Sequence, residues 1–195
     1  MEEAAGPRVL SQDAYLASAT DEELVAACVD GTPEAFRELL SRYRKSALNL
    51  AYQMLGNGED AEDAAQEAFV RVFQAVPRFR GQAAFSTWLY RIVTNLCLAR
   101  MRRRRGDVDL ETLGEPKAAD SPSQQVTEGL LTRQVLQEMS PTLRAVLLLR
   151  VEGGLSYREM AEALGVPLGT VRSRLSKARI QFRKLWRQFS QSEAS

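Results

Sequence analysis

An apolar stripe at helical spacing runs through the last quarter of the chain and determines what that part can fold into. Its core is the stretch LGVPLGTVRSRLSKARIQF, residues 164–182. Apolar side chains recur there at alternating steps of three and four residues: Leu168, Val171, Leu175, Ala178, Phe182, Leu185 and Phe189. This spacing predicts one helix whose apolar face packs on its neighbours. No segment alternates with period two for long enough to indicate a strand, so we predict an all-α fold.

Start and stop signals support further helices. Residues 32 and 140 are capping types placed before a proline at the first helical position. Ser156 begins a capping box, and Gly56 and Gly165 stand where helices are expected to end. The predicted helices span residues 21–30, 33–55, 59–76, 85–104, 127–139, 141–152, 156–164 and 167–189.

A stretch poor in large apolar residues separates these helices into two sets. Residues 106–125, GDVDLETLGEPKAADSPSQQ, have no sustained period and contain five acidic residues, which is typical of a flexible linker. We therefore predict two small helical domains, residues 21–105 and 126–190, joined by that linker. Residues 1–20 are expected to be a loosely ordered N-terminal extension without an assigned role, and the last residues a frayed tail.

The net charge of +1 conceals strong segregation along the chain. Residues 1–77 carry 6 basic and 14 acidic side chains, a net charge of −8. Residues 78–105 carry 8 basic side chains and no acidic one. Residues 165–189 carry 7 basic side chains and no acidic one. Such basic segments attract polyanions, which favours a nucleic-acid partner.

The composition excludes several classes of protein. The chain has no histidine and only two cysteines, Cys28 and Cys97, so a histidine-based catalytic triad and a zinc-type ligand set are excluded. It has no glycine-rich phosphate loop, so we predict neither an enzyme nor a bound cofactor or metal. No apolar run reaches the ~20 residues of a membrane span, and the N-terminus lacks a signal sequence. We expect a cytoplasmic protein without membrane insertion of its own, in which Cys97 is a small core residue.

The C-terminal pattern of short helix, glycine turn and long helix predicts a helix-turn-helix, whose second helix enters the DNA major groove. Arg172 can bond guanine through both arms of its guanidinium, and Ser173 or Ser176 can bond either type of base. The remaining cations suit phosphates: Arg174, Lys177, Arg179, Arg183 and Lys184. The alternative is the solvated face of an ordinary helical hairpin.

The basic segment FRGQAAFSTWLYRIVTNLCLARMRRRRG, residues 79–106, mixes aromatic residues with arginines, as single-stranded nucleic acid requires. Phe79 lies outside the predicted helix and is the better candidate for touching a base. Asn95 can contact a base or form only a local hydrogen bond. The helical spacing of the other apolar side chains favours the core for most of them: Phe85, Trp88, Leu89, Ile92 and Leu96. The run Arg102–Arg105 can bind a strand or be a solvated helix end.

Acidic side chains crowd the first half of the helix predicted at residues 59–76: Asp60, Glu62, Asp63 and Glu67, together with Gln66. Acids near a helix start are favoured electrostatically, so this face can be purely structural or can dock a protein. Its apolar side comprises Ala61, Ala65, Phe69, Val72 and Val76.

These motifs together resemble bacterial sigma factors of the extracytoplasmic-function (ECF) group of the sigma-70 family. The residues that carry the resemblance are DAEDAAQEAFVRVF at 60–73, FRGQAAFSTWLYRIVTN at 79–95 and LSYREMAEALGVPLGTVRSRLSKAR at 155–179. The resemblance extends over about residues 21–188. It implies two helical domains, region 2 and region 4, and a promoter-specificity subunit of RNA polymerase without its own catalysis.

The resemblance also implies partners and site residues. Region 2 is expected to dock on the clamp helices of the largest subunit of core RNA polymerase through Asp60, Asp63, Gln66 and Glu67. It is expected to melt the −10 element of promoter DNA and hold a flipped base, with the residues Phe79, Arg80, Asn95, Arg102, Arg103 and Arg104. Region 4 is expected to bind the −35 duplex through Thr170, Arg172, Ser173, Arg174, Ser176, Lys177 and Arg179. An anti-sigma factor is a further expected partner.

Two other classes of protein are alternatives to this resemblance. An activator of the response-regulator type has a similar helix-turn-helix but needs a receiver domain with a parallel sheet, and residues 1–105 show no alternation of strand and helix. The enzyme hypothesis lacks support, because the remaining carboxylates lie on a helix face, where contact with solvent is enough to explain their presence.

Overall fold

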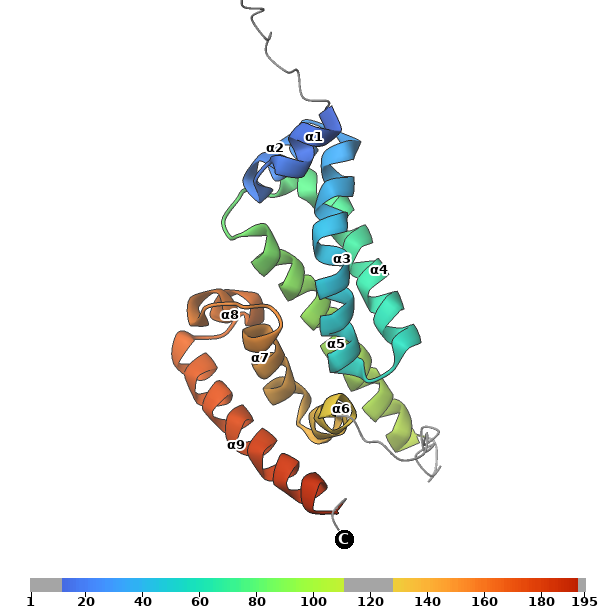
Figure 1. Ribbon diagram of the computed structural model, residues 1–195, viewed down its shortest axis with the longest axis vertical. Coiled ribbons are helices and arrows are strands. Elements are labelled where there is room, and N and C mark those ends of the chain that lie inside the picture. Colours follow the sequence, from blue (N-terminus) through green and yellow to red (C-terminus); the bar gives the residue numbers. More distant parts are fainter. Residues whose placement is uncertain (1–11, 111–127, 193–195) are drawn as a thin grey trace, which may run out of the picture.

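The computed structural model describes residues 12–110 and 128–192, and all regular structure in these ranges is helical (Figure 1). This confirms the all-α prediction. The N-terminal half comprises α1 (Gln12–Ser18), α2 (Asp21–Val29), α3 (Pro33–Leu55), α4 (Gly58–Ala75), the 3-10 turn η1 (Val76–Arg78) and α5 (Phe85–Leu110). The C-terminal half comprises α6 (Glu128–Glu138), α7 (Pro141–Val151), α8 (Tyr157–Leu164) and α9 (Leu168–Ser192).

Helices α3, α4 and α5 form the body of the N-terminal half, with α2 packed against α3 and η1. The apolar side predicted for α4 is buried in full, since Ala61, Ala65, Phe69, Val72 and Val76 are each at most 8% exposed. The alanines of α4 let the backbones approach closely. Cys97 is 0% exposed and burial raises the pKa of its thiol to about 12, which confirms a core role.

The N-terminal extension is more ordered than expected, because an arginine of α3 holds its helix in place. The guanidinium of Arg42 donates hydrogen bonds to the backbone oxygens of Leu16 (3.1 Å), Ala17 (3.0 Å) and Ala19 (2.8 Å). Leu16 and Ala17 lie in the last turn of α1, where carbonyls have few partners within the helix, and the Leu16 oxygen also accepts from the Ala19 amide at 3.2 Å. The expectation of a loose extension is therefore wrong for residues 12–20.

The C-terminal half packs α9 and α8 on α7. Ser156 forms the predicted capping box with Glu159, and Gly165 ends α8 with a left-handed φ of 62°. That conformation favours glycine and turns the chain sharply into α9. Thr32 and Ser140 stand before their prolines as predicted, but neither side chain caps its helix.

Two helices end several residues later than predicted, whereas the other predicted boundaries agree to within one residue. Helix α5 continues to Leu110, past the predicted end at residue 104 and into the predicted linker, because a helix needs no apolar periodicity once its first turns are packed. The rest of the linker, from residue 111, lies outside the described residues. Helix α9 likewise continues to Ser192, into the expected tail.

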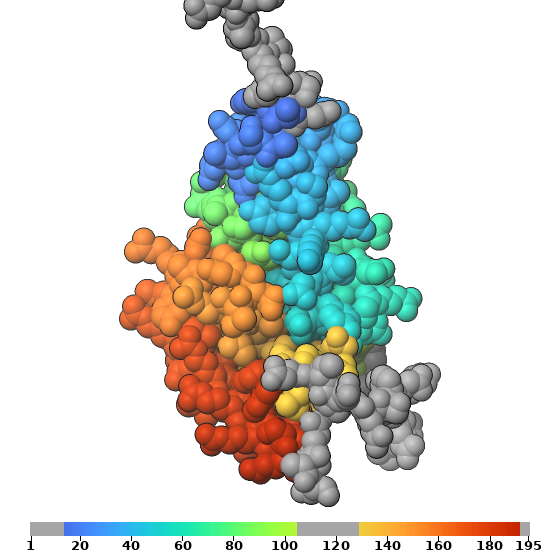
Figure 2. All heavy atoms as spheres, in the orientation of Figure 1, coloured from blue at the N-terminus to red at the C-terminus, as the bar shows by residue number. Residues whose placement is uncertain are grey.

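The two halves share one contiguous hydrophobic core rather than two separate ones. Leu50 and Met54 of α3 belong to the same buried cluster as Leu136 of α6 and Leu149 of α7. Helices α6 and α7 pack on α3, and α7 and α8 pack on α5. Figure 2 shows the orange surface of the C-terminal half pressed against the cyan and green helices. The relative placement of the halves is thus determined by direct packing.

Candidate functional site

The exposed side of α9, which we call the recognition face, carries the residues predicted to bind the −35 duplex. Val171, Leu175 and Ala178 are at most 1% exposed and hold the helix against α7 and α8. Opposite them, Arg172, Ser173, Ser176, Lys177 and Arg179 are exposed, while Thr170 and Arg174 are half-buried. Five of the seven predicted residues are therefore accessible to a partner; their contact with DNA stays a prediction.

The predicted apolar stripe is fully buried only in its middle, at Val171, Leu175 and Ala178. Leu168, at the first turn of α9, is 38% exposed, and Phe182, Leu185 and Phe189 are half-buried. Leu168 adds apolar surface beside the polar side chains of the recognition face.

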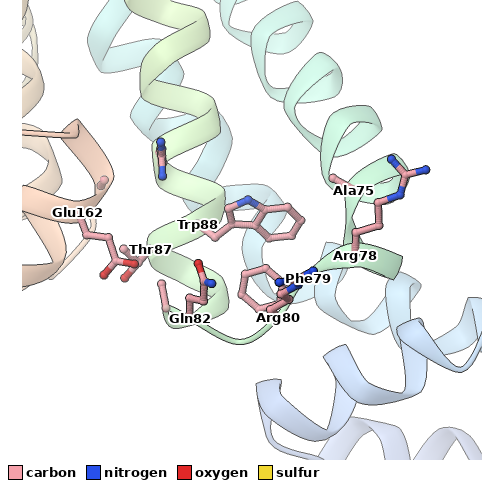
Figure 3. Close-up of a pocket in the computed structure, with 11 residues that line it drawn as sticks. Ala75, Arg78, Phe79, Arg80, Gln82, Thr87, Trp88 and Glu162 are labelled. Atoms are coloured by element: carbon pink, nitrogen blue, oxygen red, sulfur yellow. The ribbon is translucent and has the colours of Figure 1, made fainter.

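A pocket of about 350 Å³, which we call the base pocket, opens beside the loop that follows η1 (Figure 3). The rings of Phe79 and Trp88 stack with centroids 4.5 Å apart. Arg78, Arg80 and Arg91 also line the pocket, with no acidic side chain from the N-terminal half. A flat aromatic surface with cations around it suits an unstacked base and its phosphates.

The sequence pattern favours the core for Trp88 and does not single out Arg91. The structure leaves Trp88 half-buried at the pocket wall. The signal that would have identified it is its position in the first turn of α5, directly after the loop that carries Phe79.

The remaining residues predicted for the −10 strand divide between two sides of α5. Asn95 is exposed and lies seven residues after Trp88, two helical turns along the same side. Arg102 is exposed one heptad further on, so these side chains extend from the base pocket in a line. Arg104 points to α4 instead, where its guanidinium pairs with the Asp60 carboxylate.

The acidic face of α4 is partly neutralised by the chain itself. Glu67 pairs with Arg71 (2.6 Å) and with Arg100 of α5 (2.8 Å). Partial burial by itself would raise the pKa of Glu67, but the hydrogen bonds from these two guanidinium groups outweigh it and lower the pKa. Asp63 and Gln66 are exposed, so they are the members of the predicted docking set open to a partner.

An apolar groove of about 550 Å³ between α3 and α4 adjoins Gln66. Phe73 is 57% exposed and Val70 is 50% exposed, and the Phe73 ring meets Phe36 edge-on at 5.0 Å. Exposed large apolar side chains beside charged ones are typical of protein-docking surfaces. Sequence reasoning missed this groove, because apolar residues on an amphipathic helix are ordinarily assigned to the core.

Comparisons with known proteins identify the family. A model of sigma-70 region 2 matches residues 39–106, and a model of sigma-70 region 4 matches residues 130–182. The ECF RNA polymerase sigma factor SigW of Bacillus subtilis is 37% identical over 169 residues, covering 79% of this chain and 90% of SigW. The ECF RNA polymerase sigma-E factor of Escherichia coli K12 is 36% identical over 174 residues, covering 82% of this chain and 91% of the sigma-E factor. The chain belongs to the ECF sigma factors of the sigma-70 family.

Solved structures share the fold of this sigma factor. CnrH in complex with the cytosolic domain of CnrY has a TM-score of 0.62 at 23% identity and covers 85% of this chain and 96% of its own. The sigma factor RpoE in complex with the anti-sigma factor NepR from Bartonella quintana has a TM-score of 0.66 at 24% identity. The match covers 78% of this chain and 96% of RpoE.

Sigma factors are specificity subunits rather than catalysts. Within residues 12–110 and 128–192 of this sigma factor, no three Asp, Glu or Cys side chains are grouped so as to hold a metal ion. In the same ranges, no helix combines the length and apolarity that crossing a bilayer requires.

Proposed function

We propose that this sigma factor recognises the −35 duplex through the recognition face of α9 and holds the melted −10 strand at the base pocket. The observation that supports this most is the recognition face: α9 exposes a row of cations and hydroxyls and has no acidic residue. In this proposal Arg172 and Ser173 read base edges, while Arg174, Lys177 and Arg179 neutralise phosphates.

The decisive experiment is run-off transcription with core RNA polymerase on a random promoter library, followed by binding assays on the selected −35 duplex. Arg172→Ala is expected to weaken binding by about 1–3 kcal/mol on the selected duplex and by less on a scrambled one. Arg187→Ala is the matched control, because Arg187 is also an exposed arginine of α9. An equal loss on both duplexes for Arg172→Ala would make Arg172 a phosphate contact only.

For the −10 element, we propose that a flipped base enters beside Phe79 and Trp88 and that the strand continues past Asn95 towards Arg102. Stacking of a base on an aromatic side chain contributes about 1–3 kcal/mol, which offsets part of the cost of strand separation. Phe79→Ala is therefore expected to reduce permanganate-detected melting of a promoter by holoenzyme, whereas Tyr15→Ala, an exposed aromatic residue of α1, leaves it unchanged. Arg102→Ala is expected to lose more than Arg104→Ala, since Arg104 is paired with Asp60; the reverse order would contradict the proposed path of the strand.

We further propose that core RNA polymerase docks on the acidic face of α4 and the adjoining groove, through Asp63, Gln66 and Phe73. Glu67 and Asp60 shape this face through their own ion pairs. Asp63→Lys and Phe73→Ser are each expected to reduce capture of core polymerase by at least about tenfold. Glu22→Lys, a charge change at an exposed residue of α2, is the control and is expected to have no effect.

RpoE of Bartonella quintana was co-crystallised with the anti-sigma factor NepR. We propose such a regulator for this chain too, together with a cytoplasmic location and no catalytic site of its own. Co-purification of a partner that blocks run-off transcription tests the regulator. Failure of the chain to bind core polymerase in any assay would refute the sigma-factor role and leave a simple DNA-binding protein.

A further inference from the structure

The first turn of α9 contains two residues whose type is not required by the fold of the described residues. The first is Leu168, which is 38% exposed although Val171 and Leu175, the next members of the same stripe, are at most 1% exposed. A single exposed leucine is ordinary on a protein surface. Leu168, however, stands on the turn with which a helix-turn-helix meets the edges of the bases.

The second residue is Gly169. A Cβ added to Gly169 would meet no heavy atom within 4 Å, and its φ is not positive, unlike the φ of 62° at Gly165. Alanine would therefore fit the fold and favour the helix. Gly58 and Gly129 also lie in the first turns of their helices with nothing within 4 Å, so the glycine alone is not decisive. Gly169 differs because it adjoins Leu168 at the start of the recognition face, where a residue without a side chain lets a partner come close to the backbone.

Helix geometry places Leu168 at the edge of the recognition face. Leu168 and Arg172 are four residues apart, so they lie on the same side of α9, one turn from each other. Side chains on a helix tilt towards its N-terminus, so Leu168 extends ahead of the first turn, in the direction of the groove that the recognition face would enter. Every side chain predicted to bind the −35 duplex is polar, so Leu168 would be the apolar member of this contact.

The major groove offers an apolar side chain one distinctive partner. Thymine presents its 5-methyl group there beside the O4 acceptor, whereas the other three bases present only hydrogen-bond donors and acceptors. Contact between a leucine and that methyl group removes apolar surface of both from water. The same leucine against cytosine would cover the N4 amino donor without bonding it, which is unfavourable. A leucine that meets the base edges therefore favours thymine over cytosine.

We propose that Leu168 is a specificity-determining residue for the −35 duplex: it contacts the 5-methyl group of one thymine, and Gly169 gives the DNA room against the first turn of α9. The inference rests on the proposed −35 recognition by the recognition face. It adds the reading of one base by an apolar contact, which the polar side chains of that face do not supply. It also gives the exposed leucine and the helical glycine a common reason.

The test removes the methyl group from the DNA before any residue is changed. In the −35 duplex of the library-selected promoter, each thymine of either strand is replaced in turn by deoxyuridine, which lacks the 5-methyl group but keeps every hydrogen-bonding atom. The affinity of the full chain is measured by fluorescence anisotropy for the wild type and for Leu168→Ala, and circular dichroism verifies folding. Ile180→Ala is the matched control, because Ile180 is a 62% exposed aliphatic residue of α9, about three turns further along.

We expect the wild type to lose about threefold in affinity when one particular thymine is replaced, as the burial of one methyl group predicts. Leu168→Ala is expected to bind the thymine duplex at least about threefold more weakly and to lose nothing further on replacement of that thymine. Ile180→Ala is expected to respond to deoxyuridine as the wild type does. A wild type that is indifferent to every replacement would overturn the inference, as would a loss that persists in full in Leu168→Ala or a selected element without thymine in either strand.

A pair of glycine variants tests the room that Gly169 provides. Gly169 and Gly129 are the second residues of α9 and α6, and both are exposed. Alanine at either position is expected to leave the Tm at least as high as in the wild type. Only Gly169→Ala is expected to weaken binding to the −35 duplex, by at least about fivefold, because its methyl group overpacks the contact. Unchanged binding by Gly169→Ala would overturn the role assigned to Gly169. Failure of the proposed function is distinguishable, since the wild type would then not prefer the selected duplex to a scrambled one.

Discussion

Replacement of Leu175 by alanine tests how the recognition face is supported. Leu175 is 1% exposed on the side of α9 that packs on α7 and α8. Leucine-to-alanine changes at such sites remove the transfer free energy of the lost methyl groups and leave a cavity, at a cost of about 2–5 kcal/mol. The flanking residues on the stripe, Val171 and Ala178, are both 0% exposed, so little room exists for the site to collapse. We therefore expect about 3 kcal/mol or more.

The measurement is thermal and urea unfolding followed by circular dichroism and tryptophan fluorescence, with Trp186 as a reporter within α9. For a cooperative unit of this size, a loss of 3 kcal/mol lowers the Tm by about 6–12 °C. Ile180→Ala is the matched control on the same helix, because Ile180 is 62% exposed. Its expected cost is below about 1 kcal/mol, since little apolar surface is removed from the core and alanine favours the helix. Similar destabilisation by the two variants would refute the packing described for α9.

Three further predictions follow from local features. Ser156→Ala removes the capping box of α8 and is expected to cost about 0.5–2 kcal/mol in thermal unfolding. Hydrogen bonds from the Ser156 side chain and backbone lower the pKa of Glu159 from its ordinary 4.5, so its stabilisation is present above that pH and lost as the pH falls through the lowered pKa. The stability difference between wild type and Glu159→Gln should therefore be full at pH 6 and disappear in acid, and a constant difference would contradict it. Cys97, with its pKa raised to about 12 by burial, is expected to react with a thiol reagent only as fast as the protein unfolds, whereas rapid reaction in the native state would exclude a core position.

The local sequence pattern was sufficient to predict the helix-turn-helix. The spacing of Val171, Leu175 and Ala178 identified the buried side of α9, and the exposed side followed from it because side chains on a helix have fixed relative directions. The capping box at Ser156 and the left-handed glycine at 165 depend only on residues within one turn, so both were predictable. Leu168 departed from the pattern because exposure at a helix start depends on whether another helix lies over it.

Prediction was weaker wherever a side chain's role depends on a distant part of the chain. Arg104 and Asp60 are 44 residues apart, and each was assigned to a different ligand before the structure showed that they pair. Trp88 fits core spacing equally well, yet its stacking on Phe79 places it at the base pocket. Phe73 is a large apolar residue of the amphipathic helix α4 but remains exposed, because no helix of the described residues covers the groove between α3 and α4.

The amino-acid sequence alone determined the helical class, the order of the helices from α2 to α9, the exposed side of α9 and the family. These properties arise from period, capping and charge, which act over a few residues or are summed along the chain. Only the tertiary structure decided how the halves meet. Arg144 of α7 carries a charge that by itself favours solvent, yet it is 2% exposed. Its guanidinium donates to the backbone oxygen of Met54 in α3, which is 90 residues away. Long-range packing of this kind is a property of the assembled core, and no local pattern specifies it.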